Sequence, residues 1–552
     1  MAGPVSRLGD IKLSRRRFIA YSGLTMAAAA CNPVAAPSSG SPASGSPATR
    51  APSASGGAAG SATPSQTAGA VLRYGRAGDI TDFNPWDISG SETEVYNQVF
   101  SRLVWRDSDG KEHLDLAESY ELAPDGKTVT IKVRSGVKWH DGKDFTAADY
   151  VTMYGYLTDP AMAEDPNIGE MKGVLEKITG VEAPDPTTLI LKASAPVPYI
   201  ADILDYWHAI RIDNPTDFGF VATPPVGTGP FKLTEVIPSQ SVTFEANPDY
   251  YVEGQPVLGG LAISLYGGAT NLLQNLQSDS VDGILVANPA EIASVAGDDA
   301  YRVDVTPGGG VWDVYFNVRK APFDKPEVRQ ALSYAMDREA MVKAGDEGLE
   351  MGVTTPFNNP SSLGYKAELV TAHPYDLAKA KALLDAAGIK DLKIVYPSPS
   401  SIPRSETYGL IWQASLKEIG VTLEIQPVDD ARWGDIGSGK DPNTDLVIWN
   451  NGRGNRDPAI FWSTQRNFGG GAETIWGYNN PELIALVAQG AAEVDQAKRT
   501  TIYQQANQIL VDSSHVLVIS TRSQYWVYNA KVKDIDVDLI GAIVLAGASI
   551  GA

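Results

Sequence analysis

The sequence predicts an α/β fold, and three observations support this prediction. With 552 residues the chain is too long for one hydrophobic core, so we expect two or three folded units. From about residue 70 onward, aromatic and β-branched residues recur at strand spacing. In the second half, segments with helical periodicity alternate with short apolar segments, an order typical of βαβ units. The composition, 43% hydrophobic and 20% charged, is typical of a globular protein.

The first 30 residues predict an export signal. Arginines at 15–17 precede a mostly apolar segment that ends in small residues and is too short to anchor a protein stably in a bilayer. The string SRRRFI at 14–19 resembles the twin-arginine export signal, and AAAC at 28–31 resembles a bacterial lipoprotein cleavage box. We therefore expect an exported protein, periplasmic or at the cell surface, that is lipidated at Cys31. Plain signal cleavage near the same alanines is the alternative.

Residues 31–70 predict a disordered linker. Residues 32–70 are almost wholly Ala, Gly, Ser, Pro and Thr, and Arg50 is their only charge. Such a segment cannot bury enough apolar surface to offset the entropy of ordering it. As a flexible coil it would span on the order of 35 Å, which suits a folded domain held just off a membrane.

The first half of the folded part contains alternating strand patterns. Residues 128–133 alternate apolar and polar side chains after the turn-forming Pro-Asp-Gly at 124–126, and residues 188–192 and 241–244 look similar. Thr146 followed by Asp149 predicts a helix start, with Asp in the place of the usual capping-box Glu.

The second half predicts helices between strands. A helix begins at Asp376, with apolar residues on one face and Gly388 as its C-terminal stop. The pattern then predicts a strand at 392–396, a helix at 406–419, and strands at 421–425 and 445–449. This order predicts a parallel sheet with buried strands.

The segment VIWNNGRGNRDP at 447–458 passes from the last of these strands into many hydrogen-bond donors. Ligands of open α/β sheets gather beyond the carboxyl ends of strands, so this segment is a candidate ligand wall. The indole of Trp449 can stack on a planar or cationic group. Arg453 is either a solvated loop charge or a clamp on a ligand carboxylate.

Several kinds of site are not expected. The formal net charge of -21 argues against nucleic acid as a partner. A single cysteine excludes an intrachain disulfide and a thiolate zinc site, and the five histidines have no ligand spacing, so neither metal nor cofactor is expected. Residues 434–441 nearly match a phosphate-binding loop, but Asp441 replaces the required hydroxyl. No nucleophile-elbow motif is present, so catalysis is not expected.

A series of motifs resembles the bacterial extracellular solute-binding proteins of family 5, the receptors of ABC importers for dipeptides, oligopeptides and nickel complexes. The motifs are LAESY at 116–120, DGKT at 125–128, VRSGVKWHDG at 133–142, FTAAD at 145–149, GTGPF at 227–231, NPDYY at 247–251, FN at 316–317, VRQALSYAMDR at 328–338 and the helix at 375–388. They span nearly the whole chain after the linker.

The resemblance implies a two-lobed periplasmic-binding-protein fold of type II, with a hinge and a ligand cleft between the lobes. We expect lobe I at 71–310 plus 522–552 and lobe II at 311–521, with hinge crossings near 307–312 and 520–526. The implied partners are a small polar ligand, a peptide or an oligosaccharide, and ABC permease subunits in the membrane. We expect the receptor to be a monomer.

The resemblance also suggests ligand-binding residues. In the peptide-binding branch, an aspartate shortly after the strand-end tryptophan binds the peptide amino terminus. Here Asn450, Asn451 and Arg453 follow Trp449, and the first acid is Asp457. We expect these side chains to orient the ligand, and Asp457 to meet any ligand cation. Arg404, expected in a loop at 397–404, is a candidate for receiving a ligand carboxylate.

A secreted hydrolase is the alternative from another class. It would need an acid, a base or a nucleophile brought together in the cleft by the fold. A sensor on the same scaffold is a further alternative.

Overall fold

The computed structural model describes residues 69–80, 83–86, 93–162, 171–212, 225–267, 271–286, 289–452, 456–464, 468–469 and 473–551. The expected export signal, Cys31 and the linker up to residue 68 lie outside these ranges, and so does Arg453. Within the described ranges, no helix has both the length and the apolar character needed to cross a bilayer.

The largest sheet joins strands from both halves of the chain. Its strands are β1 Val71–Ala77, β8 Phe231–Ile237, β9 Ser241–Ala246, β10 Gly260–Tyr266, β11 Gly283–Val286, β12 Tyr301–Phe316, β15 Leu446–Asn451 and β16 Val516–Asn529. They are hydrogen-bonded in the order β15-β12-β16-β11-β1-β10-β9-β8. Strand β1 is parallel to β10 and β11, and the other neighbours are antiparallel.

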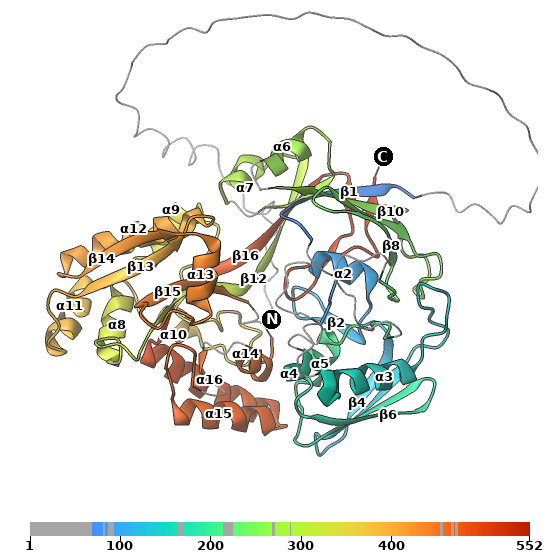
Figure 1. The fold of residues 1–552 in the computed structure, drawn as a ribbon, viewed down its shortest axis with the longest axis horizontal. Coiled ribbons are helices and arrows are strands. Elements are labelled where there is room, and N and C mark those ends of the chain that lie inside the picture. The colour runs from blue at the N-terminus through green and yellow to red at the C-terminus, as the bar shows by residue number, and fades with distance from the viewer. Residues whose placement is uncertain are drawn as a thin grey trace, which may run out of the picture. The chain divides into compact units, whose positions relative to one another are not determined.

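The long strands β12 and β16 form the antiparallel pair that carries the site described below (Figure 1). The register runs from Tyr301 opposite Asn529 to Tyr315 opposite Val516, with irregularities after Thr306 and after Trp312. On the other side of β12, strand β15 pairs from Phe316 back to Val311. The strand continues through Asn450 and Asn451, which we had expected in a loop.

In the first half of the chain, β4 Ala117–Leu122, β5 Thr128–Val133, β6 Ile178–Asp185 and β7 Thr188–Ala193 form an antiparallel sheet in the order β4-β5-β7-β6. The strand predictions at 128–133 and 188–192 are confirmed, as is the one at 241–244, which is β9. Helix α3 Ala147–Thr158 starts after Thr146, whose backbone N–H donates to the Asp149 carboxylate at 2.7 Å. The predicted helix start is therefore confirmed.

In the second half, β13 Lys393–Pro399 and β14 Thr422–Val428 pair in parallel, and α11 Leu377–Ala386 and α12 Pro403–Glu418 accompany them. The predicted helix at Asp376 is confirmed: the Asp376 carboxylate accepts the Lys379 N–H, and Gly388 has a φ of 72°. Apolar side chains from these elements, from α8 Pro326–Tyr334 and from one face of β12, β15 and β16 form a buried core.

Two predictions about this half are wrong in detail. Strand β15 pairs antiparallel with β12 in the large sheet, whereas we expected it to extend a parallel sheet. Its partner comes from more than a hundred residues earlier in the chain, so local order does not specify it. Helix α12 begins at Pro403, three residues before the predicted start, because the fixed φ of proline suits the first helical position. Arg404 consequently lies in the first turn of a helix.

The other described helices are α2 Thr93–Val99, α4 Met171–Val174, α5 Ile200–Tyr206, α6 Leu272–Gln277, α7 Pro289–Val295, α9 Arg338–Gly345, α10 Ala367–Val370, α13 Asp430–Gly437, α14 Pro458–Thr464, α15 Pro481–Ala492 and α16 Gln496–Ser513, with a 3₁₀ turn at Pro160–Met162. Three short antiparallel pairs are β2 Val104–Arg106 with β3 Glu112–Leu114, β17 Val532–Lys533 with β20 Ser549–Ile550, and β18 Asp536–Val537 with β19 Ile543–Val544.

Candidate functional site

Trp449, the expected stacking residue, lies half-buried on β15 against helix α13. Its ring centroid is 4.3 Å from that of Trp433, and the indole N–H of Trp433 donates to the Ile448 carbonyl at 2.8 Å. The backbone of Gly437 approaches the Trp449 ring so closely that a Cβ there would meet it at 2.0 Å. Part of the indole surface is thus used in packing against α13.

Asn451 is buried and makes its hydrogen bonds within the sheet. Its amide donates to both oxygens of Asp313 on β12, at 2.8 and 3.1 Å, and contacts the Tyr315 hydroxyl. Burial raises the pKa of Asp313 well above its usual value, although the hydrogen bonds from Asn451 and Tyr315 oppose this shift. Asn451 and Asp313 therefore hydrogen-bond to each other inside the protein.

Asp457, expected to meet a ligand cation, is paired with a cation of the protein. Its carboxylate accepts the Ala459 N–H at 2.9 Å in the first turn of α14 and the Arg499 guanidinium N–H at 2.7 Å. Burial raises the pKa of this carboxyl, and the attraction of Arg499 opposes the shift. Capping and the ion pair account for the position of Asp457.

Arg456 was not singled out from the sequence, yet it makes several contacts with helix α5. It is buried, forms ion pairs with Asp205 and with Asp202 at 3.5 Å, and lies over the Tyr206 ring at 4.0 Å from its centroid. Burial disfavours the charged guanidinium, but the attraction of Asp205 outweighs this, so the pKa of Arg456 is raised. In the sequence, Arg456 differs from Arg453 only in its spacing from Asp457, and this spacing does not show that the side chain of Arg456 is buried.

The ion pairs of Arg456 border a small enclosed cavity. Besides Arg456 and Asp205, its polar lining includes Arg102, His208 and Asp538. The Arg102 guanidinium lies 2.8 Å from Asp205 and 3.4 Å from Asp538. The space has room for about one water molecule, which is too little for a peptide or a sugar.

Arg404, the candidate carboxylate receptor, is already paired with a carboxylate of the protein. Its guanidinium donates to the buried Asp346 at 2.7 Å and lies over the Trp312 ring at 5.5 Å from the centroid. Burial raises the pKa of Asp346 to about 6, although Arg404 opposes the shift. The hydroxyl of Tyr408 also donates to Asp346.

The expected site residues fall into three groups. Asn450 is opposite Trp312 in the register, so it lies on the face of the sheet over which Arg404 is placed. Trp449 and Asn451 lie on the opposite face, because side chains alternate along β15. Asp457 belongs to a separate contact with α16 through Arg499.

Comparison with known proteins identifies the family. Residues 111–472 match the family described as bacterial extracellular solute-binding proteins, family 5 Middle. The chain belongs to this family. The resemblance found in the sequence motifs is thereby confirmed.

Relatives within family 5 cover most of the chain. The dipeptide-binding protein of Escherichia coli K12 is 28% identical over 85% of this chain and 93% of its own length. Heme-binding protein A of Haemophilus influenzae is 30% identical over 75% of this chain and 80% of its own length. These relatives thus include proteins named for binding different solutes.

Solved structures confirm the fold. AgaA of A. tumefaciens R10, in complex with agropinic acid, superposes with a TM-score of 0.73 at 24% identity and covers 87% of this chain and 99% of its own. DppA of Helicobacter pylori, in complex with the peptide STSA, gives a TM-score of 0.74 at 21% identity, with 88% and 98% covered. The expected α/β periplasmic-binding-protein fold is therefore the fold of this family 5 chain.

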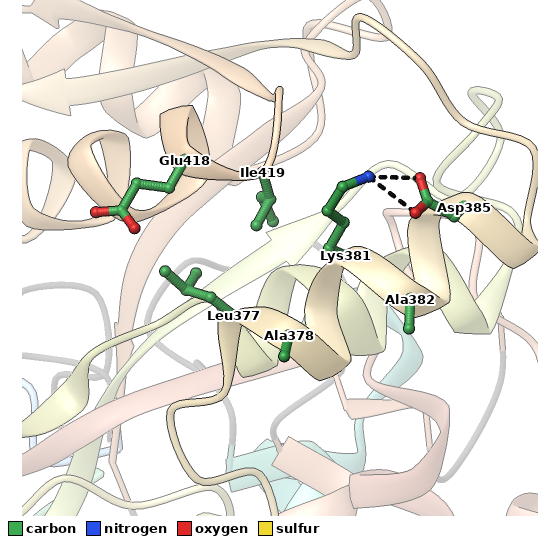
Figure 2. A pocket seen from close by; sticks show the side chains of 7 residues that line it. All are labelled: Leu377, Ala378, Lys381, Ala382, Asp385, Glu418 and Ile419. Atoms are coloured by element: carbon green, nitrogen blue, oxygen red, sulfur yellow. Dashed lines mark hydrogen bonds and ion pairs between the residues drawn. The ribbon is translucent and has the colours of Figure 1, made fainter.

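A shallow surface depression lies away from these residues (Figure 2). It is formed by α11 and the end of α12, and its lining consists of Leu377, Ala378, Lys381, Ala382, Asp385, Glu418 and Ile419. Lys381 and Asp385, one helical turn apart on α11, form an exposed ion pair at 2.8 Å in this lining. None of the expected ligand residues lies there.

The described residues do not bring together three or more His, Cys, Asp or Glu side chains in a position to hold a metal ion. The histidines of this part of the chain make other contacts. For example, His140 is hydrogen-bonded to the Gly229 carbonyl at 3.0 Å, and His208 to the Tyr206 carbonyl at 3.1 Å.

Proposed function

We propose that this protein is the extracytoplasmic receptor of an ABC importer and that it binds a peptide or a similar small polar solute. The observation that carries the proposal is the family 5 match over residues 111–472. Relatives named for dipeptide and oligopeptide binding, matched over most of this chain, support a peptide in particular. The protein would hand its ligand to permease subunits and would not change it chemically.

The proposed mechanism is closure of two lobes around the ligand. We assign lobe I to residues 71–310 plus 522–552 and lobe II to residues 311–521, so that the chain crosses between them in β12 and β16. A ligand that contacts both lobes binds the closed state better and shifts the equilibrium by that difference in affinity. With this division, the ion pair of Arg456 with Asp205 would join the two proposed lobes.

The proposed ligand wall is formed by the end of β15 and the segment after it. Asn450 would present its amide on the face over which Arg404 lies, and Trp449 would present the exposed part of its indole at the strand end on the opposite face. Arg453, outside the described residues, would add a donor from the following loop. Asn451, Asp457 and Arg404 are bonded to protein groups, so their contribution would be to hold this wall in place.

We further propose that residues 1–30 direct export and that Cys31 carries a lipid. The twin-arginine-like string and the small residues before Cys31 support this. Mass spectrometry of the mature protein would give the mass of a lipidated cysteine at its amino terminus, and Cys31→Ala would release the protein from the membrane fraction. A mature amino terminus that lacks Cys31 would contradict the anchor.

Calorimetry with a panel of peptides and oligosaccharides tests the ligand class. Heat from peptides supports the proposal, whereas heat from oligosaccharides alone would favour a sugar receptor of the same family. Formation of products during prolonged incubation would favour a secreted hydrolase. If neither class binds and no solute co-purifies with the protein, the receptor proposal fails.

A further inference from the structure

Three hydrogen-bonding side chains meet on one face of the sheet formed by β15, β12 and β16. Asn450 is opposite Trp312, Trp312 is opposite Ser520, and Arg522 is two residues beyond Ser520. Directly opposed residues of an antiparallel pair share a face with Cβ atoms about 5 Å apart, and diagonal neighbours are about 7 Å apart. Asn450, Trp312 and Arg522 thus lie in a row across three neighbouring strands.

Among the described residues, none of these three side chains has a hydrogen-bond partner, although the Arg404 guanidinium lies over the Trp312 ring. The indole N–H of Trp312 is buried without an acceptor, which is costly for a polar group. The guanidinium of Arg522 is half-buried, and no carboxylate of the described chain lies within 4 Å of it. Burial lowers the pKa of Arg522, and the nearby charge of Arg404 lowers it further.

The acidic groups around Arg522 are engaged elsewhere. Asp346 is bonded to Arg404 and Tyr408. The buried carboxylate of Glu350 accepts hydrogen bonds from the Ser523 backbone N–H at 2.7 Å and from the Tyr525 hydroxyl at 2.7 Å. These residues alternate with Arg522 along β16, so Glu350 is held on the other face. It attracts Arg522 without forming an ion pair with it.

Glycine occupies the position opposite Arg522. Gly310 is its partner in the register and has no side chain. A Cβ at Gly310 would lie 3.4 Å from the Cβ of Arg522 and 3.0 Å from the Asn451 carbonyl oxygen. A side chain at position 310 would therefore crowd Arg522 and the Asn451 carbonyl, and glycine avoids this.

We propose that Arg522, with the indole of Trp312 and the amide of Asn450, binds a carboxylate of the transported solute. This inference rests on the proposed receptor function and names the class of its ligand. A guanidinium fork matches a carboxylate with two parallel hydrogen bonds. The anionic ligand would also supply the negative charge that no neighbouring carboxylate gives to Arg522. The site differs from the one expected from the sequence, because Arg404 is already neutralised by Asp346.

The same contacts argue against a ligand ammonium group at the expected acid. Asp457 is paired with Arg499, and Asp313 is bonded to Asn451 and Tyr315. Recognition would thus depend on the anionic end of the solute more than on a cationic end. Blocking the amino end of a peptide should cost much less affinity than neutralising its carboxyl end.

Matched probes test the inference by calorimetry on the purified protein. One set contains tripeptides as free acids and as C-terminal amides, each with a free or acetylated amino end. A second set contains a disaccharide with a uronic acid and its neutral counterpart. In the set that binds, the acid is expected to bind about 10- to 100-fold more tightly than its neutral counterpart.

Variants assign the preference to Arg522. Arg522→Gln should abolish the difference between acid and neutral probes, and Arg522→Lys should retain part of it because the charge remains. Without ligand, Arg522→Gln should melt no lower than the wild type, since it removes an unpaired, partly buried charge. Lys381→Gln removes one positive charge from the exposed pair in Figure 2 and should leave the preference unchanged.

Three results would overturn the inference and leave the receptor function standing. They are equal binding of acid and neutral probes by the wild type, an acid preference that persists in Arg522→Gln, and co-purification of a solute without an anionic group in native mass spectrometry. If no probe binds and no solute co-purifies, the proposed function fails, and the inference fails with it.

Discussion

At the residue scale, Gly437 allows the indole of Trp449 to lie directly against helix α13. A Cβ at this position would be 2.0 Å from Cζ3 and 2.5 Å from Cη2 of Trp449. We expect Gly437→Ala to displace the ring and to lower the free energy of unfolding by about 1–3 kcal/mol, as overpacking does. Urea unfolding would measure the loss, and tryptophan fluorescence would report the displaced ring.

Gly434 provides a matched control in the same helix. A Cβ there would meet no atom within 4 Å. Alanine is the better helix former, so Gly434→Ala should stabilise the protein by about 0.5–1 kcal/mol. If both alanine variants had the same effect, contact with Trp449 would not be the reason for glycine at 437.

The ring of His140 predicts a dependence of stability on pH. Its Nδ1 accepts the Gly227 N–H at 3.4 Å and its Nε2–H donates to the Gly229 carbonyl at 3.0 Å, an arrangement that requires a neutral ring. Burial lowers the pKa of His140 to about 4. The unfolded chain takes up this proton near pH 6.5, so the stability contributed by the neutral ring is complete above that pH. It is lost as the pH falls toward 4.

We expect His140→Gln to remove this part of the pH dependence. Between pH 7.5 and 4.5, the free energy of unfolding of the wild type should fall by about 2–3 kcal/mol more than that of the variant. Urea unfolding at the two pH values measures the difference. At pH 7.5 the ring is neutral in both states, so a difference there reports packing alone. Parallel pH profiles for the two proteins would exclude His140 as the source.

At the element scale, helix α11 depends on Asp376, the residue just before it, for capping. The exposed carboxylate of Asp376 accepts the Lys379 N–H at 2.9 Å. We expect Asp376→Ala to cost about 1 kcal/mol of unfolding free energy, because it leaves an N–H of the first turn without its acceptor. Thermal unfolding followed by circular dichroism would show the loss.

Asp385, in the last turn of the same helix, is the control for the cap. It forms only an exposed ion pair with Lys381, and such pairs contribute little. We expect Asp385→Ala to change stability by less than about 0.5 kcal/mol. Equal losses from the two substitutions would mean that charge, and not capping, explains the effect of Asp376.

Elements with a strong local pattern were predictable from the sequence. The alternation in 128–133 is β5, and the apolar face that starts after Asp376 is α11. The partner of β15 was not predictable, since pairing with β12 is decided by packing between distant segments. The start of α12 was missed because Pro403 was taken for part of a loop.

The sequence indicates the segment that we propose as a ligand wall, but it does not indicate the contacts of the residues within it. The donors after β15 were visible in the sequence, whereas the partners that already occupy Asn451, Asp457 and Arg404 come from other elements. Arg522 is the opposite case: acidic residues are common in the chain, yet none of the described carboxylates lies within 4 Å of its guanidinium. Whether a charge is paired depends on three-dimensional distance, and spacing along the chain does not report it.

At the scale of the whole molecule, Arg456 links the two proposed lobes. Its guanidinium is buried against Asp205, Asp202 and Tyr206 of α5, while the residue itself follows β15. If the lobes separate in the open state, this contact must break and each group must meet water. If the closed state contains this ion pair, it depends on both partners, because loss of either would leave an uncompensated buried charge.

We expect Arg456→Gln to shift the equilibrium toward the open state. Removing one partner of a buried ion pair costs about 3–5 kcal/mol in the state that contains it. If that state is the closed one, the apparent dissociation constant of a bound peptide should rise at least about tenfold, since fewer molecules are competent to bind. Small-angle X-ray scattering without ligand should show a larger radius of gyration for the variant than for the wild type.

Lys381→Gln serves as a control, because it removes one positive charge, as Arg456→Gln does, but at an exposed site. It should change neither the dissociation constant nor the radius of gyration. One outcome would show that Arg456 stabilises the fold and does not favour closure. If Arg456→Gln melts several degrees lower but keeps the wild-type scattering curve and peptide affinity, the ion pair stabilises the fold in every state. Closure would then have to draw its free energy from the ligand alone, and tight binding would require the solute to contact both lobes extensively.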